Sequence, residues 1–248
     1  KDGQKEGLWT EWYENGQKKW VRCYTNGRLD GQVVGWYKNG QKKCEGYFEN
    51  GLDKGVHIGW NGDGKKRYEH NFNDGFGGGL WSEWYGNGQK EWEVYIKGGK
   101  EEGVTTFWYR NGQKWYEGNY KNGKKEGLWT WWYEDGRKER ETNFKNGFEY
   151  GCSTEWYENG QKSDEFFIVD GQRNGRLTGW YENGKKSDEG NYKDDIVDGL
   201  WTYWYENGQK KEEMNYKDGV RDGHLINWYE NGQKKWEGYF TNGWLEGL

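Results

Sequence analysis

Residues 199–222 read GLWTYWYENGQKKEEMNYKDGVRD, and residues 127–150 read GLWTWWYEDGRKERETNFKNGFEY. The two stretches have their glycines, their central tryptophan and their Tyr-Glu-Asx-Gly segment at identical positions. The same pattern continues in both directions as ten copies of 24 residues without an insertion. These copies occupy residues 7–246, residues 1–6 are part of a preceding copy, and residues 247–248 begin an eleventh. A fixed period of this length indicates a repeat architecture, so we expect one repeat array over residues 1–248.

Two turn signals divide each copy. The first is Asn-Gly or Asp-Gly, as in Asn15-Gly16, and the second follows eleven residues later, as in Asn26-Gly27. Such pairs between alternating apolar residues predict two-residue hairpin turns in which both residues have positive φ. The segments between the turns, about seven residues each, have a usual strand length. The predicted fold is therefore all-β: an elongated antiparallel meander of ten hairpin repeats.

Composition supports this fold class. The chain has 43 glycines and no alanine, and its apolar residues lack the spacing of an amphipathic helix. Only 31% of the residues are hydrophobic, but aromatic residues make up 20% of the chain. Aromatic side chains favour strands and bury a large area each, so we expect them to supply most of the packing.

One tryptophan occupies the same place in every copy, and we expect these residues to form a column along one face of the array. They are the candidate structural or interaction residues: Trp12, Trp36, Trp60, Trp84, Trp108, Trp132, Trp156, Trp180, Trp204 and Trp228. With two-residue turns, Trp12 should lie opposite Lys19. On that register Lys18 and its equivalents lie on the other face, beside Tyr13.

The glycine that opens each copy also receives a predicted role. Two-residue turns place Gly7 opposite Tyr24, and an aromatic residue or isoleucine stands at the equivalent place in every copy. We predict that this large side chain packs over the bare glycine. Across a second turn, the same reasoning places Tyr68 opposite Trp81 and predicts a cross-strand aromatic pair.

The repeat unit resembles the MORN repeat, in the variant form common in bacterial proteins. The resemblance rests on Gly127-Leu128-Trp129, Trp132-Tyr133-Glu134 and Tyr120-Lys121-Asn122-Gly123, and it covers the whole chain. It implies an elongated antiparallel sheet of stacked hairpins and a scaffold role without a catalytic signature. Some relatives are linked to membrane or protein contact, and some bacterial ones are labelled as antitoxins. The third copy departs most, at Asn61–Gly64 and Asp74–Gly79, where we expect a kink or a looser hairpin.

No catalytic or cofactor-binding constellation is found. The carboxylates recur in one turn position, as in Glu134 and Glu158, which is typical of a solvated surface rather than acid–base catalysis. His57 and His70 should face each other across the third hairpin and are the one weak candidate for a metal site. No third ligand is evident, so we expect an exposed pair and no metal. The three cysteines fall at unrelated positions, which predicts neither disulfides nor a metal site.

Charge and hydropathy predict neither nucleic-acid binding nor a transmembrane segment. The net charge is −5, from 37 basic and 42 acidic residues spread evenly, so no basic stripe indicates nucleic-acid binding. No apolar run is long enough for a transmembrane helix. The chain starts at Lys1 in mid-repeat, so we expect a processed form or a piece of a longer protein.

The leading functional hypothesis is a self-associating structural protein. Neither end has a polar capping unit, so strand edges and aromatic faces should be exposed. Either the sheet coils until one face closes on itself, or the edges and faces pair with other copies and build a filament or tube. An extracellular or cell-surface location is favoured, with the cytoplasm as the alternative. Two alternative functions are an antitoxin-like scaffold that binds another protein, and glycan or lipid binding by the tryptophan face.

Overall fold

A computed structural model of the chain describes residues 3–73 and 77–246. The chain divides into two compact units, Lys1–Lys124 (unit 1) and Lys125–Leu248 (unit 2). The described residues contain strands and turns but no helix, and their strand pairings are antiparallel, which confirms the predicted all-β class. The part of the third-copy departure at residues 74–76 and the start of the eleventh copy at residues 247–248 lie outside the described residues.

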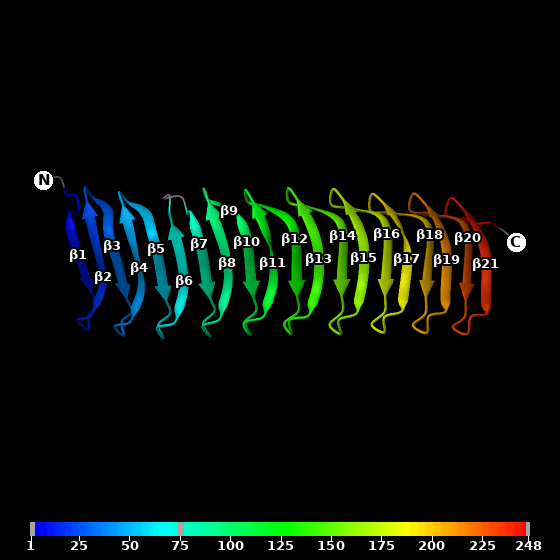
Figure 1. Cartoon of the computed structure of the whole chain (residues 1–248), viewed down its shortest axis with the longest axis horizontal. Coiled ribbons are helices and arrows are strands. Elements are labelled where there is room, and N and C mark those ends of the chain that lie inside the picture. The colour runs from blue at the N-terminus through cyan, green and yellow to red at the C-terminus, as the bar shows by residue number, and fades with distance from the viewer. Residues whose placement is uncertain (1–2, 74–76, 247–248) are drawn as a thin grey trace. The chain divides into compact units, whose positions relative to one another are not determined.

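Unit 1 is built from strands that follow one another in space as in sequence, with the first turns along one edge and the second turns along the other (Figure 1). The strands are β1 (Gly7–Trp12), β2 (Lys18–Thr25), β3 (Arg28–Trp36), β4 (Lys42–Glu49), β5 (Leu52–Trp60), β6 (Lys66–Phe72), β7 (Gly79–Trp84), β8 (Lys90–Lys97), β9 (Lys100–Glu101), β10 (Gly103–Trp108) and β11 (Lys114–Lys121).

Unit 2 repeats the arrangement (Figure 1). Its strands are β12 (Lys124–Trp132), β13 (Lys138–Lys145), β14 (Phe148–Trp156), β15 (Lys162–Val169), β16 (Gln172–Trp180), β17 (Lys186–Lys193), β18 (Ile196–Trp204), β19 (Lys210–Lys217), β20 (Val220–Trp228), β21 (Lys234–Thr241) and β22 (Trp244–Leu245).

The second turns have the predicted geometry. Asn26 and Gly27 both adopt positive φ, at 48° and 78°, as a two-residue hairpin turn requires. Asp195 replaces the turn glycine in one copy and still has a φ of 64°. Asp tolerates this left-handed conformation better than most residues, so the substitution leaves the turn type unchanged.

The first turns are longer than predicted. The Gly16 amide donates to the Tyr13 carbonyl at 2.9 Å, and the Tyr13 amide donates to the Gln17 carbonyl at 2.8 Å. Only Gly16 has positive φ, at 82°, because the Asn15 side chain accepts the Gln17 amide at 3.2 Å and stabilises a right-handed turn. The prediction of a two-residue turn was therefore wrong at this edge of the sheet.

The longer first turn changes the register next to it. Trp12 pairs with Lys18 rather than Lys19, because the register shifts between Glu11 and Trp12. The same shift occurs in all ten copies. A bulge of this kind moves side chains between faces. Lys18 and its equivalents therefore join the face of the tryptophan column, which corrects the predicted assignment of faces.

The backbone conformation at the opening position of each copy requires glycine, and the predicted packing of a ring over this glycine does not. Gly7 does pair with Tyr24, as predicted. However, Gly199 has a φ of +72°, and a Cβ added there would meet no atom within 4 Å. The β17–β18 register shifts beside this glycine, so Gly199 is a bulge residue in a conformation that favours glycine.

Rings do cover other glycines. A Cβ added to Gly35 would lie within 3 Å of the Trp20 ring, and Gly190 is covered in the same way by Trp201. One predicted aromatic pair is wrong: Tyr68 pairs with Glu83, and His70 takes the place opposite Trp81.

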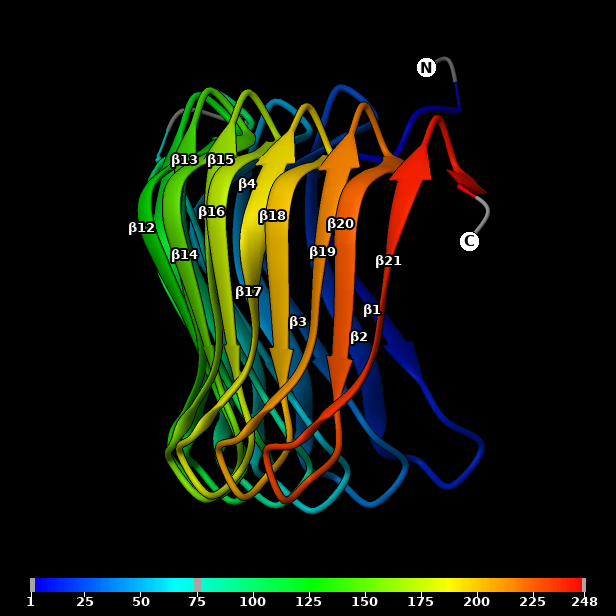
Figure 2. The same cartoon turned by 90° about the vertical axis from the view of Figure 1, so that its right-hand side faces the viewer.

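We call the face that carries the buried apolar residues the core face. Trp129 and Met214 are fully buried there, and Leu225 is 2% exposed. This burial is possible in one sheet layer because the segment just before an opening glycine folds over the face: the Lys125 ammonium lies 4.2 Å from the Trp129 ring centroid and 4.8 Å from that of Phe144. Figure 2 shows the strands of unit 2 bending near their second-turn ends, which brings these segments over the core face.

Because positive φ selects the opening glycine, we expect alanine to be tolerated less well than asparagine at this position. Gly199→Ala should lower the free energy of unfolding by about 1–2 kcal/mol, the cost of a Cβ in the left-handed region. Gly199→Asn should cost less, because asparagine tolerates that region. Urea unfolding followed by circular dichroism measures both. A larger loss for Asn than for Ala would indicate that space, not φ, selects glycine.

Candidate functional site

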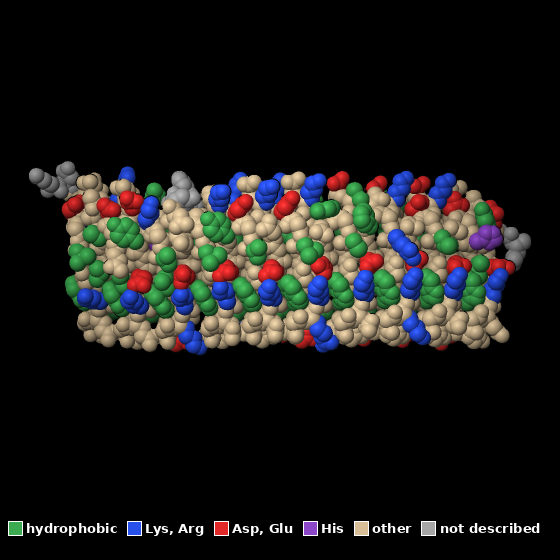
Figure 3. Space-filling view, viewed as in Figure 1, with side chains coloured by type: hydrophobic (Ala, Val, Ile, Leu, Met, Phe, Trp, Pro, Cys, Tyr) green, Lys and Arg blue, Asp and Glu red, His purple; other side chains and the backbone are tan. Residues whose placement is uncertain are grey.

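The tryptophan column is packed against lysines from neighbouring copies, and we call the face that carries it the ladder face. The Lys162 ammonium lies 5.7 Å from the Trp180 ring centroid, within cation–π range. The same contact recurs for the pairs Lys42–Trp60, Lys66–Trp84, Lys90–Trp108, Lys138–Trp156, Lys186–Trp204 and Lys210–Trp228. Figure 3 shows the resulting row, in which lysines alternate with hydrophobic side chains beside a row of acidic ones.

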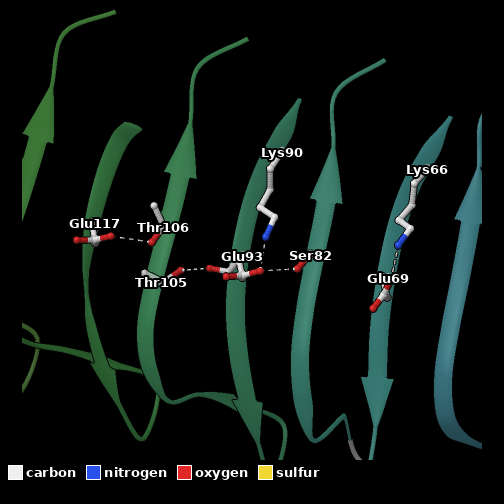
Figure 4. A network of polar contacts seen from close by, with 8 residues as sticks. All are labelled: Lys66, Glu69, Ser82, Lys90, Glu93, Thr105, Thr106 and Glu117. Carbon is white, nitrogen blue, oxygen red and sulfur yellow. Dashed lines mark hydrogen bonds and ion pairs between the residues drawn. The ribbon is translucent and has the colours of Figure 1, made fainter. Parts of the chain in front are cut away.

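The row of acidic side chains consists of glutamates that pair with these lysines, and we call the lysines, glutamates and tryptophans together the ladder. Each ladder lysine also pairs with a glutamate three residues later, such as Lys90 with Glu93 at 2.5 Å. The Ser82 hydroxyl is a second donor to the Glu93 carboxylate, at 3.0 Å, and the Thr106 hydroxyl donates to Glu117 in the same way (Figure 4). The rings therefore serve as packing surfaces for cations of the array itself. The sequence alone missed this lysine–tryptophan contact because the predicted register put the two residues on opposite faces.

A second inter-repeat ladder runs along the first turns. The Tyr205 hydroxyl donates to the Trp228 carbonyl at 2.9 Å, and the Asn207 amide group donates to the Glu230 carbonyl at 2.8 Å. Equivalent tyrosine bonds join Tyr13 to Trp36, Tyr37 to Trp60, Tyr85 to Trp108, Tyr133 to Trp156, Tyr157 to Trp180 and Tyr181 to Trp204. The Tyr-Glu-Asn-Gly segment is therefore a stacking device as well as a turn.

The third copy preserves this stacking by a different residue. Asp63 stands where most other copies have asparagine, and it therefore lacks the amide donor. Lys65 replaces that donor: its ammonium lies 3.3 Å from the Gly86 carbonyl oxygen and 3.4 Å from that of Asn87. The turn is closed by the usual bonds from Asn61 and Gly64, so the looser hairpin expected at Asn61–Gly64 is not found.

The core face carries a row that differs from copy to copy, and we call it the variable row. It contributes one residue per long strand, and neighbours along it are directly paired across the sheet. In unit 1 the row is Glu11, Trp20, Gly35, Cys44, Gly59, Tyr68, Glu83, Trp92, Phe107 and Tyr116. In unit 2 it is Trp131, Arg140, Glu155, Asp164, Gly179, Asp188, Tyr203, Glu212, Asn227 and Trp236.

The variable row is aromatic in unit 1. The rings of Trp92 and Phe107 stack with centroids 6.2 Å apart, and Phe107 and Tyr116 stack at 4.4 Å. Burial raises the pKa of Tyr116 to about 12, so its hydroxyl stays protonated at neutral pH. This part of the row is a half-buried aromatic strip.

The variable row is acidic in unit 2. Glu155 pairs across the sheet with Asp164, and only Glu155 has a cationic neighbour in contact, Arg140 at 3.4 Å. Burial raises the pKa of both carboxyl groups. Arg140 lowers the pKa of Glu155, while for Asp164 the Ser163 hydrogen bond and the charge of Arg173 lower the pKa and the charge of Asp188 raises it. Like charges placed opposite each other destabilise a sheet, so packing alone does not explain this row.

The two candidate histidines pair across β5 and β6 as predicted, but they are not exposed. Their side chains are 12% and 18% exposed, and His70 stacks on Trp81 with centroids 4.4 Å apart. His57 Nδ1 lies 3.3 Å from Asp53, and His70 Nε2 lies 3.5 Å from Glu83. Within the described residues, no group of three or more His, Cys, Asp or Glu side chains has the geometry to hold a metal ion.

The remaining candidate residues are the three cysteines. Cys23, Cys44 and Cys152 are free thiols, and burial raises the pKa of Cys44. Of the residues that the structure describes, none belongs to a helix with the length and apolarity needed to cross a membrane.

Comparison with known proteins identifies the repeat. A family model described as MORN repeat variant matches residues 5–26, 29–50, 101–122, 125–146, 173–194 and 197–218, which together span more than half of the chain. A search of curated proteins gives no match.

The tyrosine ladder can be tested with a matched pair of variants. Tyr205→Phe removes one hydrogen bond to the next copy and should lower the free energy of unfolding by about 1 kcal/mol. Tyr229 occupies the same turn position, is 50% exposed, and its hydroxyl has no partner among the described residues, so Tyr229→Phe should be nearly neutral. Urea unfolding compares the two. Equal effects would show that the hydroxyl bond does not stabilise the stack.

His70 should make stability depend on pH. Burial, and then the neighbouring His57, lower the pKa of His70 from its ordinary value of 6.5. The unfolded state therefore binds the proton more readily, and the His70 contribution to stability, complete above about pH 6.5, is lost as the pH falls towards the folded-state pKa. Tm measured from pH 8 to pH 5 should fall more for the wild type than for His70→Met. Parallel curves would contradict this assignment.

Proposed function

The chain belongs to the MORN repeat variant family, and we propose that it is a non-enzymatic scaffold that binds a protein partner along the variable row of its core face. One observation carries this proposal. The ladder face uses the same lysine, glutamate and tryptophan in nearly every copy, whereas the variable row changes its chemistry from copy to copy.

The contrast follows from what each face does. On the ladder face the lysine of one copy packs against the tryptophan of the next, as Lys162 does on Trp180, so a change at either position disturbs two repeats. The variable row is not needed for stacking between first turns, and its residues are free to match a partner. Aromatic residues and arginine are enriched in protein interfaces, and both occur in the row, as Trp92, Phe107 and Arg140 show.

The row also indicates the chemistry of the partner. The aromatic strip of unit 1 suits an apolar surface, and the acidic row of unit 2 suits a basic one, since Asp164 and Asp188 form no ion pair with any described residue. The tryptophan column supports the glycan or lipid alternative less well, because the lysine ladder already packs against rings such as Trp180.

Self-association is the second candidate function, and a separate observation favours it. The ladder face carries exposed aliphatic residues at one position of several copies: Leu8, Val56, Leu80 and Val104 in unit 1, and Leu128 and Leu200 in unit 2. Leu80 is 46% exposed and Val104 is 62% exposed. A periodic row of this kind is self-complementary, so two copies related by a two-fold axis could bury their rows against each other.

Site-specific photo-cross-linking in cells that naturally produce the protein distinguishes the two functions. A benzophenone amino acid at Trp92 or Tyr203, in the variable row, should form a cross-link to a different protein. The same group at Leu80 should link two copies if the chain self-associates through its ladder face. Trp180 serves as the control position because its ring is packed against Lys162. Cross-links from the variable row only to a second copy, or none, would contradict the scaffold proposal.

A further inference from the structure

Unit 2 has an apolar hollow on its second-turn edge that the repeat pattern does not explain. The hollow has a volume of about 470 Å³ and lies between the turns that join β13 to β14 and β15 to β16. Its apolar walls are Phe148, Tyr150, Phe167 and Val169, which are 65%, 41%, 48% and 43% exposed. We call these four residues the hollow cluster.

Three members of the hollow cluster replace polar residues of neighbouring copies. Tyr150 stands where residues 102 and 126 are glutamate. Val169 stands where residues 145 and 193 are lysine, and Phe167 where residues 143 and 191 are asparagine. The polar consensus shows that the fold does not require apolar side chains at these exposed positions.

One of these replacements gives up a stabilising contact. In the preceding copy, the Glu126 carboxylate accepts the backbone amide of Asn146 at 2.9 Å, and Glu102 accepts that of Asn122 at 2.7 Å. Tyr150 is the equivalent of these glutamates, but the Asp170 amide has no such bond among the described residues. An exposed aromatic ring at the expense of a charge-assisted hydrogen bond is typical of a residue selected for function rather than for stability.

Two charges of opposite sign flank the hollow. Lys145 precedes one turn and Asp170 lies in the next, and both line the hollow. Neither side chain forms an ion pair or a hydrogen bond with any described residue, so both charges are available to an occupant. Glu149 also lines the hollow and is already paired with Arg140 at 2.8 Å.

We propose that the hollow cluster binds one apolar side chain of an extended protein segment, with an acidic residue of that segment beside Lys145 and a basic residue beside Asp170. The hollow has room for an aromatic or branched aliphatic side chain together with part of the backbone beside it, and an anchor residue in a pocket is a common centre of protein interfaces. The mixed rim charges fit a peptide better than an anionic membrane surface, which would need a net positive rim. The inference rests on the proposed scaffold function only in taking the occupant to be a protein. It places a second docking site at the second-turn edge of unit 2, separate from the variable row.

A phage-displayed library of random 12-residue peptides, selected on the purified full chain, tests the proposal. Selected peptides should carry an aromatic or branched aliphatic residue with an acidic and a basic neighbour. Selection on Lys145→Glu should replace the acidic neighbour by a basic one, because the rim charge has been reversed. A merely structural role for Lys145 would not change the selected sequences.

The control variant uses residues that the chain itself carries one copy earlier. Tyr150→Glu, Phe167→Asn and Val169→Lys together reproduce Glu126, Asn143 and Lys145, so this triple variant should keep or raise the Tm. Its affinity for the selected peptides should fall at least about tenfold. Undiminished binding by the folded triple variant, or selected peptides without an apolar residue, would overturn the proposal.

Two further measurements decide between occupants. Sedimentation of the wild type and the triple variant tests a second copy of the chain, and flotation with phosphatidylcholine vesicles tests a lipid surface. Dimerisation or vesicle binding that is lost in the triple variant would overturn the peptide assignment. The peptide selection uses purified protein and probes the second-turn edge, so its failure leaves the cross-linking test of the variable row unaffected.

Discussion

The first turn of each copy is the constraint on which the rest of the structure depends. A glycine at positive φ, such as Gly16, closes a turn one residue longer than a simple Asn-Gly hairpin and shifts the neighbouring register by one position. Side chains alternate between the faces of a sheet, so this single shift decides which residues meet. It places lysine on the face of the tryptophan column and creates the ladder.

The ladder explains how a chain with few aliphatic residues holds a sheet together. Each contact is weak: an exposed cation–π pair contributes about 0.5–1 kcal/mol, and an exposed ion pair contributes no more. Their number compensates, because most copies repeat the lysine–tryptophan contact, the lysine–glutamate pair and the tyrosine hydrogen bond to the next copy. Stability in such arrays comes largely from interfaces between adjacent repeats.

Because stacking is concentrated on the ladder face and the first turns, other surfaces can change. The variable row is richer in aromatic residues in unit 1 and richer in carboxylates in unit 2, and this change leaves the strand pairing unaltered. The hollow cluster departs from the consensus at the opposite edge of the strands. A binding scaffold requires a constant framework on which the surface chemistry can vary. A catalytic centre is not expected to recur periodically.

The sequence by itself determined the period, the positions of both turns, the all-β class and the family, because glycine, asparagine and aromatic residues have strong local preferences that recur every 24 residues. It also determined that Gly7 lies opposite Tyr24, since that pairing lies beyond the bulge and is counted from the turn. Only the tertiary structure decided which face each side chain occupies. The Asn15 side chain selects a right-handed turn by one hydrogen bond, and composition does not reveal that choice. The contact of Lys162 with Trp180 follows from a bulge that no residue pattern predicts, because the balance of backbone hydrogen bonds across two strands sets a bulge. His70 is stacked on Trp81, which the predicted register placed opposite Tyr68.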